Sequence, residues 1–172
     1  MGRASVKENK NIYQLSREAC GMTRAEASEA MVWLTESRIE KIESGKSSPS
    51  ADEVLAMAKA YKKSALCNQF CSSECAIGQK YVPAAEEKAI EKIVLELLAE
   101  LNALDKNKNR LIEITSDGVI HDDQIEDFVF IRDQLSRIAS SAASLTLWFD
   151  DTVENGDVNP KIVRQVLQSK DQ

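Results

Sequence analysis

The sequence has few of the residues that make turns and sheets. Aromatic residues account for 5% of its 172 residues, and it contains six glycines and three prolines. A fold with many turns between β-strands needs more of these residues, so a β-sandwich or barrel is disfavoured. Hydrophobic residues at 43% and charged residues at 29% are instead typical of a soluble protein with much exposed helix. We therefore expect an all-α fold.

The sequence also lacks segments that would direct it to a membrane. MGRASVKENK at the N-terminus contains no apolar run, and no stretch of 18 apolar residues follows it. Gly2 fits a myristoylation motif, but Val6 stands where that motif has Ser or Thr. We expect a cytoplasmic protein that binds no membrane. In that compartment the four cysteines are expected to be reduced thiols or metal ligands rather than disulfides.

Residue combinations that most enzymes use are missing as well. His121 is the only histidine, and the chain offers no Ser/His/Asp set, no Gly-rich phosphate loop and no pair of carboxylates placed for a cleft. We therefore predict no catalytic residues and no enzymatic activity.

Positive charge is concentrated in the N-terminal part of the chain. The formal net charge is −6, but residues 1–63 contain eleven Lys/Arg and nine Asp/Glu and are net +2, which leaves −8 on the remaining residues. A mildly basic N-terminal part on an acidic body is compatible with nucleic-acid contact through the N-terminal part alone.

Four short helices are predicted between residue 11 and residue 63. In the first, Ile12, Leu15 and Ala19 form an apolar stripe at helical spacing, which we expect to face the core. Residues that favour helix starts precede the other three helices. Thr23 and Glu26 fit a capping box at the start of the second helix, Thr35 can cap the third, and Ser50 or Asp52 can cap the fourth.

The pattern changes after Pro83. Between residues 86 and 115 apolar residues recur at the alternating four- and three-residue spacing of a heptad, with one polar position at Lys108. The members of this series are Ile90, Val94, Leu97, Leu101, Leu104, Leu111 and Thr115. A second series follows in Ile125, Phe128, Ile131, Leu135, Ile138, Ala142, Leu145 and Phe149. Two long helices joined by a short loop predict an antiparallel hairpin.

Both apolar series are wider than one partner helix needs to cover. The surplus includes Leu98 and Leu101 in the first series and Trp148 and Phe149 in the second. Apolar surface that one chain cannot hide is commonly covered by a second copy of it. We therefore predict a homodimer that associates through residues 84–172.

Residues 13–61 resemble a known DNA-binding family. The stretches LSREACGMTRAEASEAM and ESRIEKIESGKSSPSADEVLAMAKAY resemble the helix-turn-helix of Cro and cI-type phage repressors, the XRE family. The part after Pro83 is similar, more loosely, to the helical tails of regulators related to SinR. The resemblance implies a lambda-repressor-like domain in which the third helix enters the major groove of double-stranded DNA. It also implies that Glu43 is structural and ties the end of this helix to a neighbour.

The candidate DNA-binding residues follow from this arrangement. Outward-facing side chains of the third helix are expected to meet base edges, with Arg38 and Lys41 as readers, while Ile39 and Ile42 face the core. Phosphate contacts are expected at the start of the second helix and in the loop after the third. The full set is Thr23, Arg24, Thr35, Glu36, Ser37, Arg38, Lys41 and Lys46.

Three cysteines form a second candidate site. Cys67, Cys71 and Cys75 are spaced as C-x3-C-x3-C, so that neighbours share one face of a helix and could clamp zinc or iron, with Cys20 or His121 as a fourth ligand. This spacing differs from that of zinc knuckles and ferredoxin-type clusters. Three small thiols near a helical core are the other interpretation. No cofactor is expected otherwise.

The sequence thus predicts three segments. Residues 1–63 are a helix-turn-helix DNA-binding domain, residues 64–83 a cysteine-containing connector, and residues 84–172 a self-associating helical hairpin. The predicted function is a sequence-specific, dimeric transcriptional regulator. Two alternatives stay open. Val32, Trp33 and Leu34 make the turn one residue longer and more apolar than is usual in the family, which allows a protein–protein interaction module. The three cysteines allow a cysteine-based metal or redox sensor.

Overall fold

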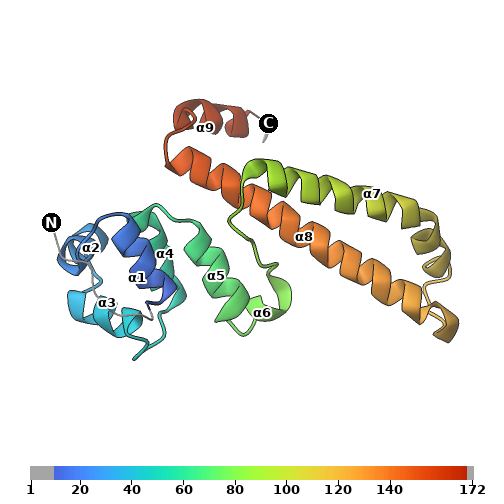
Figure 1. The fold of residues 1–172 in the computed structure, drawn as a ribbon, viewed down its shortest axis with the longest axis horizontal. Helices are drawn as coiled ribbons and strands as arrows, with labels where there is room; N and C mark the ends of the chain where they lie inside the picture. The colour runs from blue at the N-terminus through green and yellow to red at the C-terminus, as the bar shows by residue number, and fades with distance from the viewer. Residues whose placement is uncertain (1–9, 170–172) are drawn as a thin grey trace. The chain divides into compact units, whose positions relative to one another are not determined.

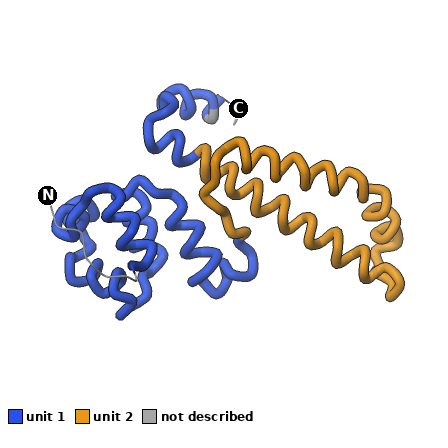
Figure 2. Tube along the Cα trace, viewed as in Figure 1, with its two compact units in different colours: residues 1–82, 150–172 blue, residues 83–149 orange. Residues whose placement is uncertain are grey.

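A computed structural model describes residues 10–169. All regular secondary structure in this range is helical, which confirms the predicted all-α fold (Figure 1). Gly2, Val6 and the outer ends of the predicted segments 1–63 and 84–172 lie outside the described residues. The chain divides into two compact units (Figure 2). The first contains the residues up to Val82 and those from Asp150 onward, and the second is Pro83–Phe149.

Short helices build the first unit and long ones build the second. In chain order the helices of the first unit are α1 (Ile12–Ala19), α2 (Arg24–Met31), α3 (Glu36–Glu43), α4 (Ala51–Tyr61), α5 (Ala65–Ser73), α6 (Gly78–Tyr81) and α9 (Pro160–Gln168). The second unit holds α7 (Ile90–Ile114), the 3₁₀ turn η1 (Asp122–Gln124) and most of α8 (Ile125–Glu154).

Side-chain caps set where helices α2, α3 and α4 begin. Thr23 and Glu26 form the predicted capping box of α2, and Thr35 accepts a hydrogen bond from a backbone N–H in the first turn of α3. At α4 the cap is Ser50, which forms a second capping box with Glu53. Each cap satisfies backbone N–H groups that have no partner inside the helix, so these starts are fixed locally by the sequence.

Helices α1 to α5 share one apolar core. Its buried members are Tyr13, Ala27, Met31, Leu34, Ile39, Ile42, Val54, Met57, Ala58, Tyr61 and Leu66. Leu66 belongs to α5, and Cys67 and Phe70 of the same helix pack against the core. The hydroxyl of Tyr13 also donates to Oε1 of Glu74, just after α5, at 2.7 Å. The cysteine-bearing segment is therefore an integral part of the first unit.

The predicted apolar stripe of α1 faces the core only in part. Ile12 packs against the core, but Leu15 is 52% exposed and Ala19 is exposed, whereas Gln14 and Arg17 are buried. These polar side chains tolerate burial because they have partners: Gln14 donates to Glu18, and Arg17 donates to other segments of the domain. An apolar stripe counted along α1 alone cannot reveal such partners.

Helices α7 and α8 run antiparallel in the second unit (Figures 1 and 2). Late residues of α7 pair with early residues of α8, since Arg110 donates to Asp127 at 2.6 Å. Earlier in α7, Glu100 accepts from Ser141 at 3.0 Å. The heptad assignment is shifted in the structure: Ile93 is buried, whereas Leu101 of the predicted series is exposed.

The turn between α2 and α3 is strained. Val32 has φ 61° and ψ −52°, and the N–H of Trp33 donates to the carbonyl of Met31 at 2.7 Å, which closes a γ-turn of the rare hand. A β-branched residue at positive φ is a true outlier. The turn persists because Ser28 holds it, since its hydroxyl donates to the carbonyl of the buried Leu34 at 2.8 Å.

Replacing Val32 with glycine is therefore expected to stabilise the protein. Val32 is 89% exposed and loses little packing, while relief of about 1–3 kcal/mol of strain exceeds the roughly 0.5–1 kcal/mol that glycine costs in chain entropy. Urea denaturation followed by circular dichroism should show a gain of about 1 kcal/mol in the free energy of unfolding. V32A is the control, because it keeps the Cβ and most of the strain. Equal stability of V32G and V32A would contradict a strained turn.

Candidate nucleic-acid interface

Helix α3 separates an inward face from an outward one. Ile39, Ile42 and Glu43 are buried, which confirms the predicted inward orientation of the two isoleucines. The opposite side carries exposed polar residues that form no hydrogen bond or ion pair with other described side chains. They are Glu36, Ser37, Glu40 and Lys41. The inward face of α3 is therefore packed into the core, and its outward face is exposed to solvent.

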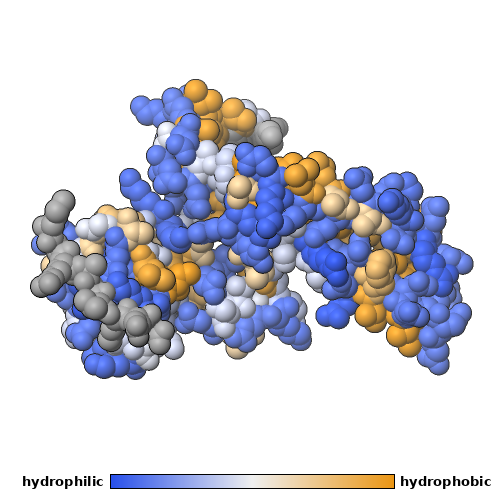
Figure 3. All heavy atoms as spheres, viewed as in Figure 1, coloured by the Kyte–Doolittle hydropathy of each residue, from blue (hydrophilic) through white to orange (hydrophobic). Residues whose placement is uncertain are grey.

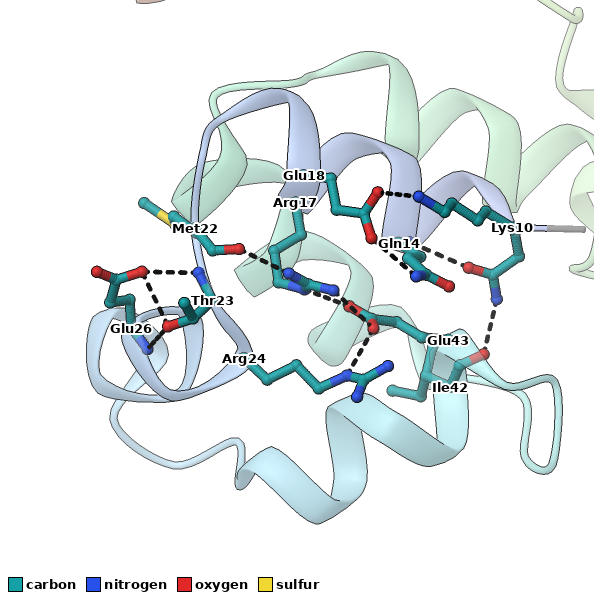
Figure 4. A network of polar contacts seen from close by, with 11 residues as sticks. Lys10, Gln14, Arg17, Glu18, Met22, Thr23, Arg24, Glu26, Ile42 and Glu43 are labelled. Atoms are coloured by element: carbon teal, nitrogen blue, oxygen red, sulfur yellow. Dashed lines mark hydrogen bonds and ion pairs between the residues drawn. The ribbon is translucent and has the colours of Figure 1, made fainter. Parts of the chain in front are cut away.

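Glu43 is the anchor of α3. Its side chain is 1% exposed and accepts hydrogen bonds from Nε of Arg17 at 2.5 Å and from Nη2 at 3.0 Å (Figure 4). Arg24 donates from Nε to the same carboxylate at 2.8 Å. The hydrogen bond to Glu43 raises the pKa of Arg17 above its ordinary value. One carboxylate thus joins α1, α2 and α3.

Two predicted phosphate-binding residues lie at the start of α2. The N–H and hydroxyl of Thr23 both donate to Glu26, so the capping box uses the polar groups of Thr23 (Figure 4). Arg24 is oriented by Glu43 through Nε, and 37% of its side chain stays exposed. Its Nη1 and Nη2 have no partner among residues 10–169, so they can donate outward.

Arg38 is tightly held. Nε and Nη2 donate to the two carboxylate oxygens of Glu53 at 2.6 and 2.8 Å, Nη1 donates to the hydroxyl of Ser47 at 2.5 Å, and Nη2 also donates to the carbonyl of Ser48 at 2.9 Å. The Arg38 guanidinium holds the pKa of the Glu53 carboxyl below its usual value. Lys41 and Lys46, in contrast, are exposed.

The basic residues of the predicted DNA-binding set are therefore only partly free. Of these four cations, Arg24 and Arg38 are paired with acids, while Lys41 and Lys46 form no ion pair within residues 10–169. The outward side of α3 adds two carboxylates to this surface. Contacts with phosphates must then rely on a few side chains and on backbone N–H groups.

Comparison with known families assigns this arrangement of helices. The family model described as helix-turn-helix matches residues 15–66, from α1 into α5. Residues 15–66 form a helix-turn-helix domain. The match supports the resemblance to XRE-type regulators and, in general terms, a DNA-binding regulator. No curated protein and no solved structure matches the chain. None of the helices within residues 10–169 has the length and apolarity needed to cross a bilayer.

The predicted cysteine ligands lie at the edge of the helix-turn-helix domain and beyond it. Cys67, Cys71 and Cys75 are half-buried free thiols, and Cys20 is an exposed one. Within residues 10–169 no group of three or more His, Cys, Asp or Glu side chains is arranged to hold a metal ion. Burial raises the pKa of the Cys67 thiol above its ordinary value.

Two partners in the helix-turn-helix domain were missed by the sequence analysis. Arg17 holds Glu43, and Glu53 holds Arg38. A signal existed for Glu53, because a capping-box Glu carries a carboxylate at a fixed place beside its helix start. No sequence signal pointed to Arg17, because its partner Glu43 is 26 residues away.

Removal of the Glu43 charge should destabilise the helix-turn-helix domain strongly. E43Q leaves two guanidinium groups against a neutral amide in a buried site, and breaking a buried ion pair from one side costs about 3–5 kcal/mol. E40Q is the matched control, since Glu40 is exposed on the same helix and its change should stay within about 0.5 kcal/mol. Urea denaturation of both variants measures this difference. Similar stabilities would show that Glu43 does not anchor α3.

Proposed function

We propose that the protein is a cytoplasmic, sequence-specific transcriptional regulator that binds double-stranded DNA as a dimer. The main support is the helix-turn-helix match over residues 15–66, in which α3 has a buried back and an open, solvated front. A recognition helix needs both features, because the back fixes its orientation and the front must reach base edges in the major groove.

Base reading is assigned to the exposed side chains of α3. Lys41 can donate to guanine O6 or N7, Ser37 can donate or accept, and the carboxylate of Glu36 can accept from the amino group of cytosine. Thr35 caps this helix and so fixes its first turn, from which Glu36 and Ser37 extend. An exposed acid in the groove favours sequences that offer donors there.

Phosphate contacts are assigned to both sides of α3. At the start of α2, the Nη groups of Arg24 are free to donate to a phosphate, whereas the N–H and hydroxyl of Thr23 are held by Glu26. In the loop after α3, Lys46 is exposed. So few cations release few counterions, and we expect weak binding to random DNA and a shallow dependence of affinity on salt.

The second unit carries the surface that we assign to dimerisation. On α8, exposed apolar side chains recur at seven-residue spacing in Phe128, Leu135, Ala142 and Phe149. On α7, Leu95, Leu98 and Leu101 are exposed as well. Apolar residues reach the surface over this unit in the space-filling view (Figure 3). Fully burying such a side chain contributes about 1.5–3 kcal/mol before ordering costs, so a few of them can support a dimer.

A two-fold dimer would place two recognition helices on one duplex. Dimeric helix-turn-helix proteins contact half-sites about one helical turn apart, roughly 34 Å. We therefore expect a DNA target with two-fold symmetry. The hairpin would supply the axis, and the two helix-turn-helix domains would supply the contacts.

Selection from a random DNA pool tests the proposed DNA reading. The wild-type protein should enrich a two-fold sequence, and fluorescence anisotropy should then separate two classes of residue. K41A should lose about 1–3 kcal/mol on the selected duplex and little on a random one. K46A should lose affinity equally on both, because it contacts phosphate. If no sequence is enriched, the proposal is wrong.

Sedimentation equilibrium at micromolar concentration tests the dimer. The wild-type chain should sediment as a dimer, and L135E should be monomeric because it places a charge in the apolar stripe of α8. S136E is the matched control, since it adds the same charge at the next, exposed position. A monomeric wild-type protein would contradict the proposed dimer. If both L135E and a variant without residues 84–172 remain dimeric, the interface lies outside these residues.

A further inference from the structure

The loop between α3 and α4 is held in place by one side chain of α3. At the start of the loop, the N–H groups of Lys46 and Ser47 donate to the carbonyl of Lys41 at 2.9 and 3.2 Å, and these two bonds are backbone contacts of the loop with α3. Its outer part depends on Arg38, which donates to the hydroxyl of Ser47 and the carbonyl of Ser48. The loop also carries Lys46, one of the proposed phosphate contacts.

Glu53 completes the connection to α4. Its carboxylate accepts the two parallel donors of Arg38 and also the N–H of Ser50 at 2.7 Å. Ser50 is the N-cap of α4, so the same carboxylate serves the helix cap and the ion pair. Arg38 and Glu53 thus tie α3, the loop and the start of α4 into one network.

The donor count of Arg38 limits what else it can bind. A guanidinium group has five N–H donors. The contacts with Glu53, Ser47 and Ser48 use the single donor of Nε, both donors of Nη2 and one donor of Nη1. Guanine is read by two parallel donors on O6 and N7. Arg38 has one donor left and cannot make that contact while the network is intact.

We propose that Arg38 is a positioning residue, which fixes the α3–α4 loop so that Lys46 meets the DNA backbone, rather than a residue that reads bases. This inference rests on the proposed DNA-binding function and replaces the expectation that Arg38 reads base edges. A loop that is already ordered pays no ordering entropy when it meets DNA. Loss of the network should therefore weaken binding to every sequence alike, by about tenfold.

Two substitutions separate positioning from base reading. R38K keeps the positive charge but loses the planar fork, and E53Q keeps Arg38 while removing its charged partner. Each should bind the selected duplex and a random duplex about tenfold more weakly than wild type. Electrostatics alone predicts the opposite result for E53Q, because removing a negative charge near DNA should strengthen binding. E40Q is the control for that electrostatic effect and should bind more tightly.

Amide hydrogen exchange supplies a readout that does not depend on DNA. The N–H groups of Lys46 and Ser47, which donate to the carbonyl of Lys41, should exchange faster in R38K than in wild type, while circular dichroism and the melting transition show a folded protein. Unchanged exchange, a loss confined to the selected duplex, or tighter binding by E53Q would each overturn the positioning role. Wild-type protein that binds neither duplex would instead reject the proposed function itself.

Discussion

The arrangement of the first three helices depends on one buried carboxylate. Glu43 would be very costly in the core without partners, and Arg17 and Arg24 supply them from two other helices. The apolar contribution of α2 is small, with Ala27 and Met31 as its buried residues. Because apolar contacts have no direction and charge-assisted hydrogen bonds do, the ion pairs define how α3 is oriented. These ion pairs therefore also determine where the outward surface of α3 lies.

The local parts of the fold were predictable from the sequence. Caps at Thr23, Thr35 and Ser50 act within three residues of themselves, so a short window contains the whole interaction. Burial of Arg17 depends on a residue 26 positions away, and no local pattern carries that information. The contact between Arg38 and Glu53 was missed for the same reason, because Glu53 lies beyond the loop.

The long helices show a different limit. A heptad pattern identifies apolar positions along a helix. It does not show which of two neighbouring faces of that helix packs against the other helix of the same chain. On α8, Ile131 turned out to be buried while Phe128 and Leu135 stayed exposed, although all three fit one series. On α7 the buried positions are Ile93 and Ile114, neither of which belongs to the predicted series. Side-chain packing between the helices decides this choice, and a sequence pattern alone does not contain it.

The division of α3 into two faces has a consequence for the sequence reading that we propose for it. The side chains that hold the helix, Ile39, Ile42 and Glu43, are different residues from those that face outward. Substitutions at Glu36, Ser37 or Lys41 therefore leave the core and its ion pairs untouched. If these residues read DNA as proposed, new target preferences can accumulate through steps that are neutral or nearly neutral in stability. The fold can then be inherited unchanged while the specificity diverges.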